Sequence, residues 1–162
     1  MTEFMKFNSR IFDESFLHRC DERIAAFYHM WKSKCGDNCI PSRSDFDPID
    51  MVRFLPGITL VDVDRETFEL TYRLVGTNEV AVRGKDPTGE NVKAHFHANN
   101  WEDAWKNYHH VIKTKGVAYD DSDIPNSNGA MVGDETVFVP LSPDGEHVNI
   151  VMLYSIQRRL SS

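Results

Sequence analysis

Four histidines fall within sixteen positions of this sequence, a spacing that could support metal binding or proton transfer. An imidazole can bind a transition metal or transfer a proton near neutral pH. His109 and His110 are adjacent on a predicted helix, where neighbouring side chains diverge by about 100°, so at most one faces the interior. His109 borders the apolar face and is a candidate ligand-binding residue. A surface metal site is compatible with the spacing, but exposed polar side chains are the simpler prediction for His95, His97 and His110.

The three cysteines offer a second possible metal-binding group. Cys35 and Cys39 are four positions apart, and with His29 they could hold zinc. A C-x₃-C spacing without a second pair of ligands is a weak zinc signature, and small buried or half-buried thiols explain it more simply. We therefore predict no metal site. The odd number of cysteines also argues against a disulfide framework.

Two arginines and three aromatic residues are the other candidate ligand-binding groups. A guanidinium can hold a carboxylate or phosphate by paired hydrogen bonds. Arg73 alternates with Tyr72 along a predicted strand, so these two cannot face the same cavity. Tyr72 could donate its hydroxyl into a pocket, but burial in the core is the simpler interpretation for all three aromatic residues. The candidate ligand-binding set is Tyr72, Arg73, Arg83, Trp105, Tyr108 and His109.

Acidic residues concentrate in the last third of the chain. The formal net charge is −7, from 18 Lys and Arg against 25 Asp and Glu, and residues 117–157 contain seven acids and no Lys or Arg. Such a segment repels phosphate, which makes nucleic acid a poor partner. Asp120, Asp121 and Asp123 could pair for catalysis, but no base or oxyanion donor accompanies them. We therefore predict a solvated acidic rim that favours basic or apolar partners, and no catalytic residue.

The elements that must position these groups begin with a predicted helix over residues 14–34. Asp13 is a suitable N-cap and Gly36 a suitable stop. Five apolar residues in this helix alternate at spacings of three and four, which forms an a/d seam about two heptads long. The seam predicts packing on the helix's own domain, or a homodimer interface as well. Its residues are Leu17, Cys20, Ile24, Phe27 and Trp31.

The remaining pattern indicates one α+β domain. A second long helix is predicted over residues 100–115, with Asn100 as its N-cap. Its predicted inner face consists of Trp101, Trp105, Tyr108 and Ile112. An antiparallel sheet of five strands, with the helices gathered on one face, accounts for the order of elements. The predicted strands are 58–64, 67–76, 117–124, 136–141 and 147–157.

Several motifs in this order resemble a bacterial PAS-like family of unassigned function. The segments that carry the resemblance are Pro41–Pro48, Tyr72–Thr77, Gly84–Gly89 and Val139–Gly145, within a match over roughly residues 20–157. The resemblance implies a PAS-like domain over residues 37–162, preceded by an N-terminal flanking helix within residues 1–36. It also implies a pocket between sheet and helices, and dimerisation through flanking helices.

PAS domains sense light, redox state, gases or small metabolites, and the resemblance extends that expectation to this chain. Flavin photochemistry uses a cysteine in an Asn-Cys-Arg-Phe-Leu-type helix, whereas Asn38-Cys39 is followed by Ile40-Pro41 before the first predicted strand. Haem-binding members place an axial histidine near the second long helix. The cofactor is therefore unknown.

The sequence contains neither an apolar run of 18 residues nor a signal peptide, and common phosphate-loop and hydrolase signatures are absent. We expect a cytoplasmic, non-enzymatic sensory or regulatory module that acts in signal transduction as a homodimer. Its partners would be a small-molecule ligand and a signalling protein, but neither nucleic acid nor a membrane. A small enzyme using the same pocket and a ligandless structural adaptor are the alternatives.

Overall fold

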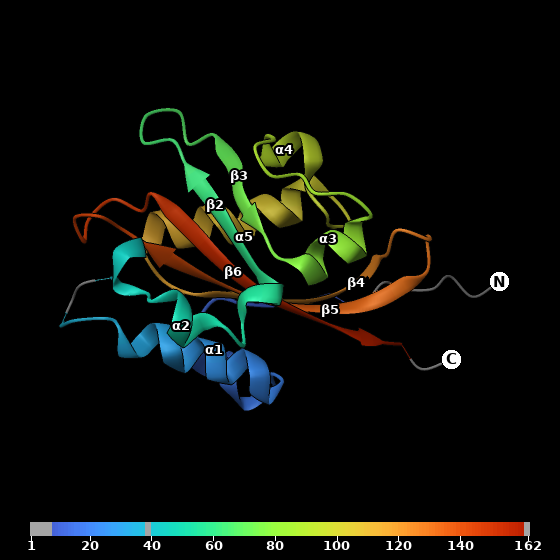
Figure 1. The fold of residues 1–162 in the computed structure, drawn as a ribbon, viewed down its shortest axis with the longest axis horizontal. Helices are drawn as coiled ribbons and strands as arrows, with labels where there is room; N and C mark the ends of the chain where they lie inside the picture. The colour runs from blue at the N-terminus through green and yellow to red at the C-terminus, as the bar shows by residue number, and fades with distance from the viewer. Residues whose placement is uncertain (1–7, 38–39, 161–162) are drawn as a thin grey trace.

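An antiparallel sheet of six strands forms the centre of the computed structural model, which describes residues 8–37 and 40–160 (Figure 1). The strand order is β1-β4-β5-β6-β2-β3, and every neighbouring pair is antiparallel. The predicted α+β class and antiparallel sheet are confirmed. The strands are β1 (Asn8–Ile11), β2 (Ile58–Val63), β3 (Leu70–Val75), β4 (Ala118–Pro125), β5 (Met131–Leu141) and β6 (Ile150–Arg159).

The strand missing from the five-stranded prediction is β1. It pairs with β4 at the sheet edge, from Asn8 opposite Ser122 to Ile11 opposite Tyr119. Four residues are too few to show a clear alternation, so the edge of β4 rather than the local pattern makes this segment a strand. The prediction is also wrong about where β5 begins, because the hairpin turn closes early, with the amide of Asn126 donating to the carbonyl of Ala130 at 2.7 Å.

Helices cover both faces of the sheet, so the prediction that they gather on one face is wrong (Figure 1). One face carries the 3₁₀ helix η1 (Glu14–His18), α1 (Glu22–Ser33) and α2 (Pro48–Met51). The opposite face carries α3 (Thr77–Arg83), α4 (Val92–His95) and α5 (Trp101–Thr114). Two further 3₁₀ turns, η2 (Arg43–Asp45) and η3 (Leu55–Gly57), lie before β2. The central strands are buried on both faces, and each face therefore needs a helical layer.

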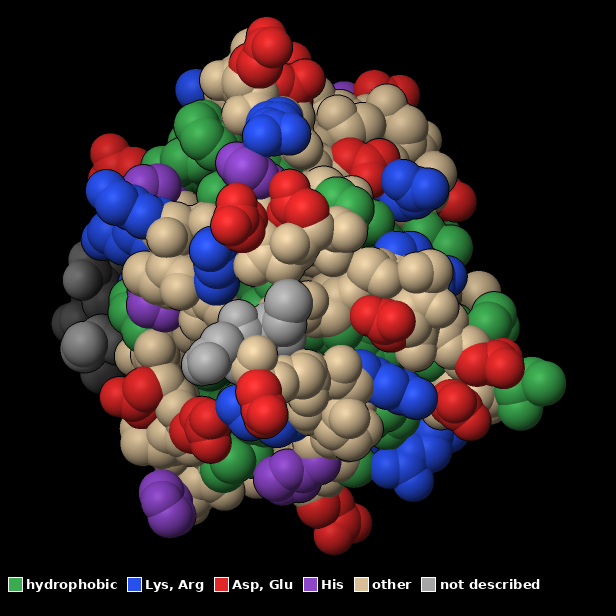
Figure 2. Space-filling model, turned by 90° about the vertical axis from the view of Figure 1, so that its left-hand side faces the viewer, with side chains coloured by type: hydrophobic (Ala, Val, Ile, Leu, Met, Phe, Trp, Pro, Cys, Tyr) green, Lys and Arg blue, Asp and Glu red, His purple; other side chains and the backbone are tan. Residues whose placement is uncertain are grey.

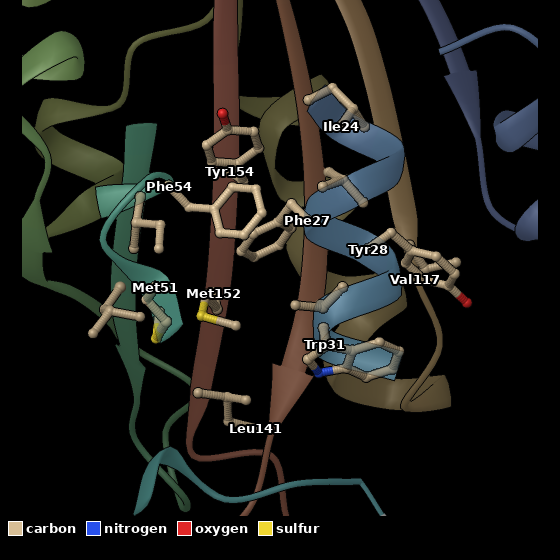
Figure 3. Packing of buried hydrophobic residues seen from close by; sticks show 14 of the residues in the cluster. Ile24, Phe27, Tyr28, Trp31, Met51, Phe54, Val117, Leu141, Met152 and Tyr154 are labelled. Carbon is tan, nitrogen blue, oxygen red and sulfur yellow. The ribbon is translucent and has the colours of Figure 1, made fainter. Parts of the chain in front are cut away.

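The layer under α1, which we call the outer core, is rich in aromatic rings (Figure 3). The ring of Phe27 stacks on Tyr154 with 5.0 Å between centroids, and it meets Phe54 edge to face at 5.6 Å. The indole of Trp31 donates to the carbonyl of Pro140 at 3.0 Å, so its one polar atom is satisfied in the core. The layer under α5, the inner core, includes Val61, Leu70, Tyr72, Tyr108, Val111, Phe138, Val151 and Leu153.

The helix predicted over residues 14–34 is two helices. Asp13 caps η1 as predicted, accepting from the amide of Ser15 at 2.9 Å. The chain then leaves the helical path, and Asp21 caps α1 by accepting from the amide of Arg23 at 2.8 Å. The amide of Asp21 donates to the carboxylate of Glu135 at 2.7 Å, which fixes this restart on the sheet. A second N-cap residue inside the apolar stripe is thus the local reason for the break.

The predicted dimer seam lies largely inside the protein's own outer core. Ile24, Phe27 and Trp31 are at most 4% exposed, and Leu17 and Cys20 pack at the margin of the same cluster. The stripe therefore covers the sheet, as the prediction that this helix packs on its own domain requires. These three side chains leave no surface for a partner helix. The division of the chain at residue 36 stays a prediction.

Two local shifts change which residues face the inner core. In α5 the buried residues are Ala104, Asn107, Tyr108 and Val111, whereas Trp101, Trp105 and Ile112 are half-buried, so the predicted inner face is rotated. In β3 a register shift opposite Leu60 and Val61 leaves Arg73 without a partner residue. Beyond this bulge, Leu74 turns outward and Val75 inward, so the alternation of buried and exposed residues is interrupted.

Candidate ligand cavity

A small cavity of about 70 Å³ lies between the inner face of the sheet and the layer of α3 and α5. Its wall combines side chains from β4, β5 and β6 with side chains from α3, α5 and the segment between α4 and α5. Aromatic residues close its apolar side. They are the buried side chains of Tyr72, Tyr108 and Phe138. The rest of the wall is polar and charged.

Three of the six predicted ligand-binding residues line this cavity: Tyr72, Arg83 and Tyr108. Arg73 instead forms an exposed ion pair with Asp62 at 3.1 Å, on the side of β3 away from the wall. The prediction that Arg73 and Tyr72 face different ways is confirmed.

The other two predicted residues, Trp105 and His109, lie outside the cavity on the rotated face of α5. His109 is exposed, with its ring 5.5 Å from that of Trp105. The histidine that does line the cavity is His97, which was predicted to be an exposed polar residue. It lies just before α5, where helical periodicity gives no indication of side-chain direction.

Arg83 is the cation of the cavity wall. Its guanidinium donates to the hydroxyl of Tyr72 and to the carbonyl of His95, both at 3.0 Å, and lies over the Tyr72 ring at 4.7 Å. The Nε atom of Arg83 is buried and has no hydrogen-bond partner among the described residues. The side chain is therefore held in place at its tip, and its Nε–H is left without an acceptor.

Two carboxyl groups, Glu79 from α3 and Asp134 from β5, share one donor group. The Gln157 amide nitrogen donates to Glu79 at 2.7 Å and to Asp134 at 2.6 Å. Thr136 donates to the other oxygen of Asp134 at 3.1 Å. Burial, with Glu79 nearby, raises the pKa of Asp134 to about 8, and burial also raises the pKa of Glu79 against the opposing effect of Arg83. Asp134 is therefore protonated at neutral pH.

Three further residues of the wall each carry a buried polar atom without a partner. Asn99 donates its Nδ2 to the carbonyl of Asp123 at 3.0 Å, and Asn107 donates its Nδ2 to Asp120 at 2.7 Å. In the described part of the chain, nothing reaches Oδ1 of Asn99, Oδ1 of Asn107 or Nε2 of His97. Burial and the nearby Arg83 lower the pKa of His97, which keeps its ring neutral. The apolar periodicity used to predict the inner faces does not identify polar wall residues such as these. For Asn107, the available signal was a polar residue within a helix that packs on the sheet.

The acidic stretch of the last strands is not the solvated rim that the sequence predicted. Asp121 and Glu135 are only 4% and 5% exposed, on the outer face of the sheet. Arg158 binds both of them, at 2.5 Å and 3.4 Å, and Arg19 binds Asp121 at 3.0 Å. Basic residues from outside the acidic segment thus pair with these two acids. On the surface, acidic and basic side chains are interspersed over the end of the molecule drawn in Figure 2.

Two searches of the described residues bear on partners. None of the helices has the length and apolar composition needed to cross a membrane. Within the same residues, no three His, Cys, Asp or Glu side chains gather where they could hold a metal ion. Cys39, one of the three residues weighed as zinc ligands, lies outside the described residues.

The fold agrees with comparisons to known proteins. A solved RNA-binding light-oxygen-voltage receptor aligns with 94% of this chain at 9% identity and a TM-score of 0.53, and the alignment spans 38% of that receptor. A fungal LOV domain photoreceptor aligns with 72% of this chain at 12% identity and a TM-score of 0.47, over 94% of its own length. No curated protein matches. The PAS domain family matches residues 20–154, most of the chain. The chain therefore belongs to the PAS domain family, as its motifs predicted.

Proposed function

We propose that this protein is a sensory or regulatory PAS module that binds a small polar molecule in the cavity between the sheet, α3 and α5. One observation carries the proposal: four buried polar atoms without partners belong to residues of one cavity wall. They are Nε of Arg83, Nε2 of His97, Oδ1 of Asn99 and Oδ1 of Asn107.

The cost of such atoms is the physical reason for expecting an occupant. A buried donor or acceptor without a partner destabilises the folded state by about 1–3 kcal/mol. Folded proteins satisfy nearly all such groups, with protein atoms or with bound molecules. Four in one cavity supply both donors and acceptors, so the occupant must be polar. Because drug-sized ligands fill pockets of roughly 300–1,000 Å³, a cavity of about 70 Å³ selects a molecule of few heavy atoms.

The wall does not fit a flavin or a haem. The described cysteines Cys20 and Cys35 pack against the outer core, across the sheet from the cavity, so neither can react with a flavin there. His97 is the histidine of the wall, but the cavity is far smaller than a porphyrin and is lined by carboxyl groups. The chemistry of this site therefore favours a small metabolite over either cofactor.

A ligand signal would travel through neighbouring residues of the same strands. Asp134 lines the cavity and accepts from Gln157, whereas the next residues along, Glu135 and Arg158, pair with each other on the outer face of the sheet. Glu135 accepts from the amide of Asp21, the N-cap of α1. A ligand that prefers one arrangement of Asp134 and Gln157 shifts the population of states, and with it the docking of α1. The output is a change at α1 that a signalling protein partner could read.

An experiment that fills the cavity tests this function. In Ala104→Leu, a larger side chain on α5 projects from the cavity wall, whereas Ala81→Leu adds the same atoms to an exposed position on α3. Native mass spectrometry of the full chain should detect a small bound mass in the wild type and in Ala81→Leu, but not in Ala104→Leu. Circular dichroism checks that both variants fold. A wild-type protein without a bound mass, or a folded Ala104→Leu protein that keeps it, would contradict the proposal.

The raised pKa of Asp134 favours a second candidate, a small enzyme that uses this carboxyl group as an acid. Turnover of a metabolite that is lost in Asp134→Asn would support it, whereas binding without turnover supports the sensor.

The non-enzymatic role, the cytoplasmic location and the homodimer belong to the proposal. The mass of the full chain in solution tests the homodimer, whose interface must lie elsewhere than at Phe27 and Trp31.

A further inference from the structure

The four unpartnered atoms of the cavity are not chemically equivalent. The amide nitrogens of Asn99 and Asn107 are committed to acceptors, so the unpartnered Oδ1 atoms are acceptors in a fixed orientation. His97 hydrogen-bonds the backbone of Pro125, which has no N–H, so the ring donates there and Nε2 is left as an acceptor. The wall therefore offers three unpartnered acceptors and, at Arg83 Nε, one donor.

The charged groups around the cavity are paired with one another, so the unpartnered acceptors define the ligand. Asp120 lies beside Asn107, and its countercharge is Arg10 of β1, 3.5 Å away. Arg10 also lies 3.6 Å from Asp103 of α5, and Asp103 is paired with Lys106 at 3.9 Å as well. On the other side of the cavity, Arg83 faces Glu79 and Asp134. Around Asn107, which is 2% exposed, two carboxylates and two cations are thus in balance, and the unpartnered acceptors of the wall distinguish one ligand from another.

We infer that the ligand is a small primary amine, bound as its ammonium ion by Oδ1 of Asn99, Oδ1 of Asn107 and Nε2 of His97, with a hydroxyl or similar acceptor for Nε of Arg83. An ammonium group carries three donors and no acceptor, which matches the three unpartnered acceptors of the wall. The small cavity limits the rest of the molecule to a few atoms. This inference rests on the proposed function and specifies its ligand class.

Three probes of nearly equal size separate the amine from other polar ligands. Ethanolamine carries an ammonium group and a hydroxyl, ethylene glycol replaces the ammonium by a hydroxyl, and glycolate replaces it by a carboxylate. Calorimetric titration of the full chain should show ethanolamine binding at least tenfold more tightly than either of the others. Preferred binding of glycolate or ethylene glycol overturns the amine class and leaves the proposed function standing. If no probe binds, the amine class is overturned, and native mass spectrometry decides the proposed function separately.

Variants at the acceptors test the assigned contacts. Asn107→Leu and Asn99→Leu each remove one acceptor and should weaken ethanolamine binding roughly tenfold or more, because hydrogen bonds to charged groups are the strong ones. Asn78→Leu makes the same change at an exposed position on α3 and should bind as the wild type does. Two variants are used so that misfolding of one leaves the test intact. Unchanged ethanolamine affinity in a folded acceptor variant would overturn the assignment.

Proton release offers an independent measurement. A bound ammonium group favours the charged form of Asp134, whose pKa of about 8 in the free protein also reflects Glu79 and Asp120. The other ionisable residues of the wall are Tyr72, Arg83, His97, Asp103 and Tyr108. Arg10 pairs with Asp120 and Asp103, and Lys106 pairs with Asp103. Ethanolamine binding should therefore release protons and tighten as pH rises toward about 8, whereas Asp134→Asn should abolish the release. Proton uptake, or a release that persists in Asp134→Asn, would contradict the inference.

Discussion

At the scale of single residues, the Asp134 carboxyl group shows how the fold alters ordinary chemistry. It accepts hydrogen bonds from Gln157 and Thr136, which favour its charged form, but burial beside Glu79 outweighs them and raises its pKa to about 8. The same group in an unfolded chain titrates near 3.8. Between these two values, the folded protein holds a proton at Asp134 that the unfolded chain has lost.

This difference predicts how stability depends on pH. Because the folded state binds the extra proton, the stability associated with Asp134 is full below about pH 4 and is lost as pH rises toward about 8. The slope is at most about 1.4 kcal/mol per pH unit. Asp134→Asn should remove this loss. The free energy of unfolding of the variant, relative to that of the wild type, should therefore increase between pH 5 and pH 8, by no more than the slope just given, and urea denaturation measures it.

Asp37→Asn is the matched control, because Asp37 is exposed to solvent. It should change the free energy of unfolding equally at both pH values. If Asp134→Asn behaved in the same way as this control, the carboxyl group would be charged in the folded state, and the account of the cavity electrostatics would be wrong.

At the scale of elements, α1 shows how one apolar stripe can be compatible with two structures. The spacing of Ile24, Phe27 and Trp31 is the spacing of a dimer seam and equally that of a helix on a sheet. In the protein the stripe meets β5 and β6, where Phe27 packs between the rings of Tyr154 and Phe54. Packing on the apolar outer face of its own sheet forms these contacts within one chain, so they do not depend on protein concentration as a dimer interface would.

Phe27→Ala measures the contribution of this packing. Removing a fully buried ring leaves a cavity between α1 and β6, and the expected loss is about 3–5 kcal/mol in the free energy of unfolding. His29→Ala, at an exposed position of the same helix, should change it by less than about 0.5 kcal/mol. Chemical denaturation compares the two. A Phe27→Ala loss as small as that of His29→Ala would mean that α1 is not part of the cooperative core.

At the scale of the whole molecule, the sheet separates two cores and joins them through its strands. Residues that alternate along β4, β5 and β6 place Asp120 and Asp134 toward the cavity and Asp121 and Glu135 toward α1. The acids of β4 and β5 are therefore divided between the cavity wall and an ion-pair network on the outer face of the sheet. Neither half is the open acidic surface that its composition indicates.

Deleting residues 1–36 tests whether the outer layer is integral. Without η1 and α1, the outer core loses Phe16, Ile24, Phe27 and Trp31, and the apolar face of the sheet becomes exposed. We expect the truncated chain to lose cooperative thermal unfolding in circular dichroism, whereas a detachable flanking helix would leave the transition nearly unchanged. The second result would contradict the packing described for α1.

Local pattern alone determined much of this protein. Asp13 and Asn100 cap helices as predicted, the strand segments lie near their predicted places, and the ordered motifs indicated a PAS domain before any coordinates. Tyr72, Arg83 and Tyr108 were also identified, because aromatic and guanidinium groups beside an expected pocket are visible in sequence. Caps, periodicity and turns act between residues close in the chain, so the sequence displays them directly.

Only the tertiary structure decided which face each element shows. The bulge at Arg73, the rotation of α5 that buries Asn107 and exposes His109, and the pairing of β1 with β4 depend on contacts distant in the chain. The pairing of Asp121 with Arg19 and Arg158 joins residues more than 30 positions apart. A rotation of one residue on a helix or strand changes which side chains are buried at little local cost. The balance of packing and charge over the whole fold therefore selects it, and with it the polar wall of the cavity.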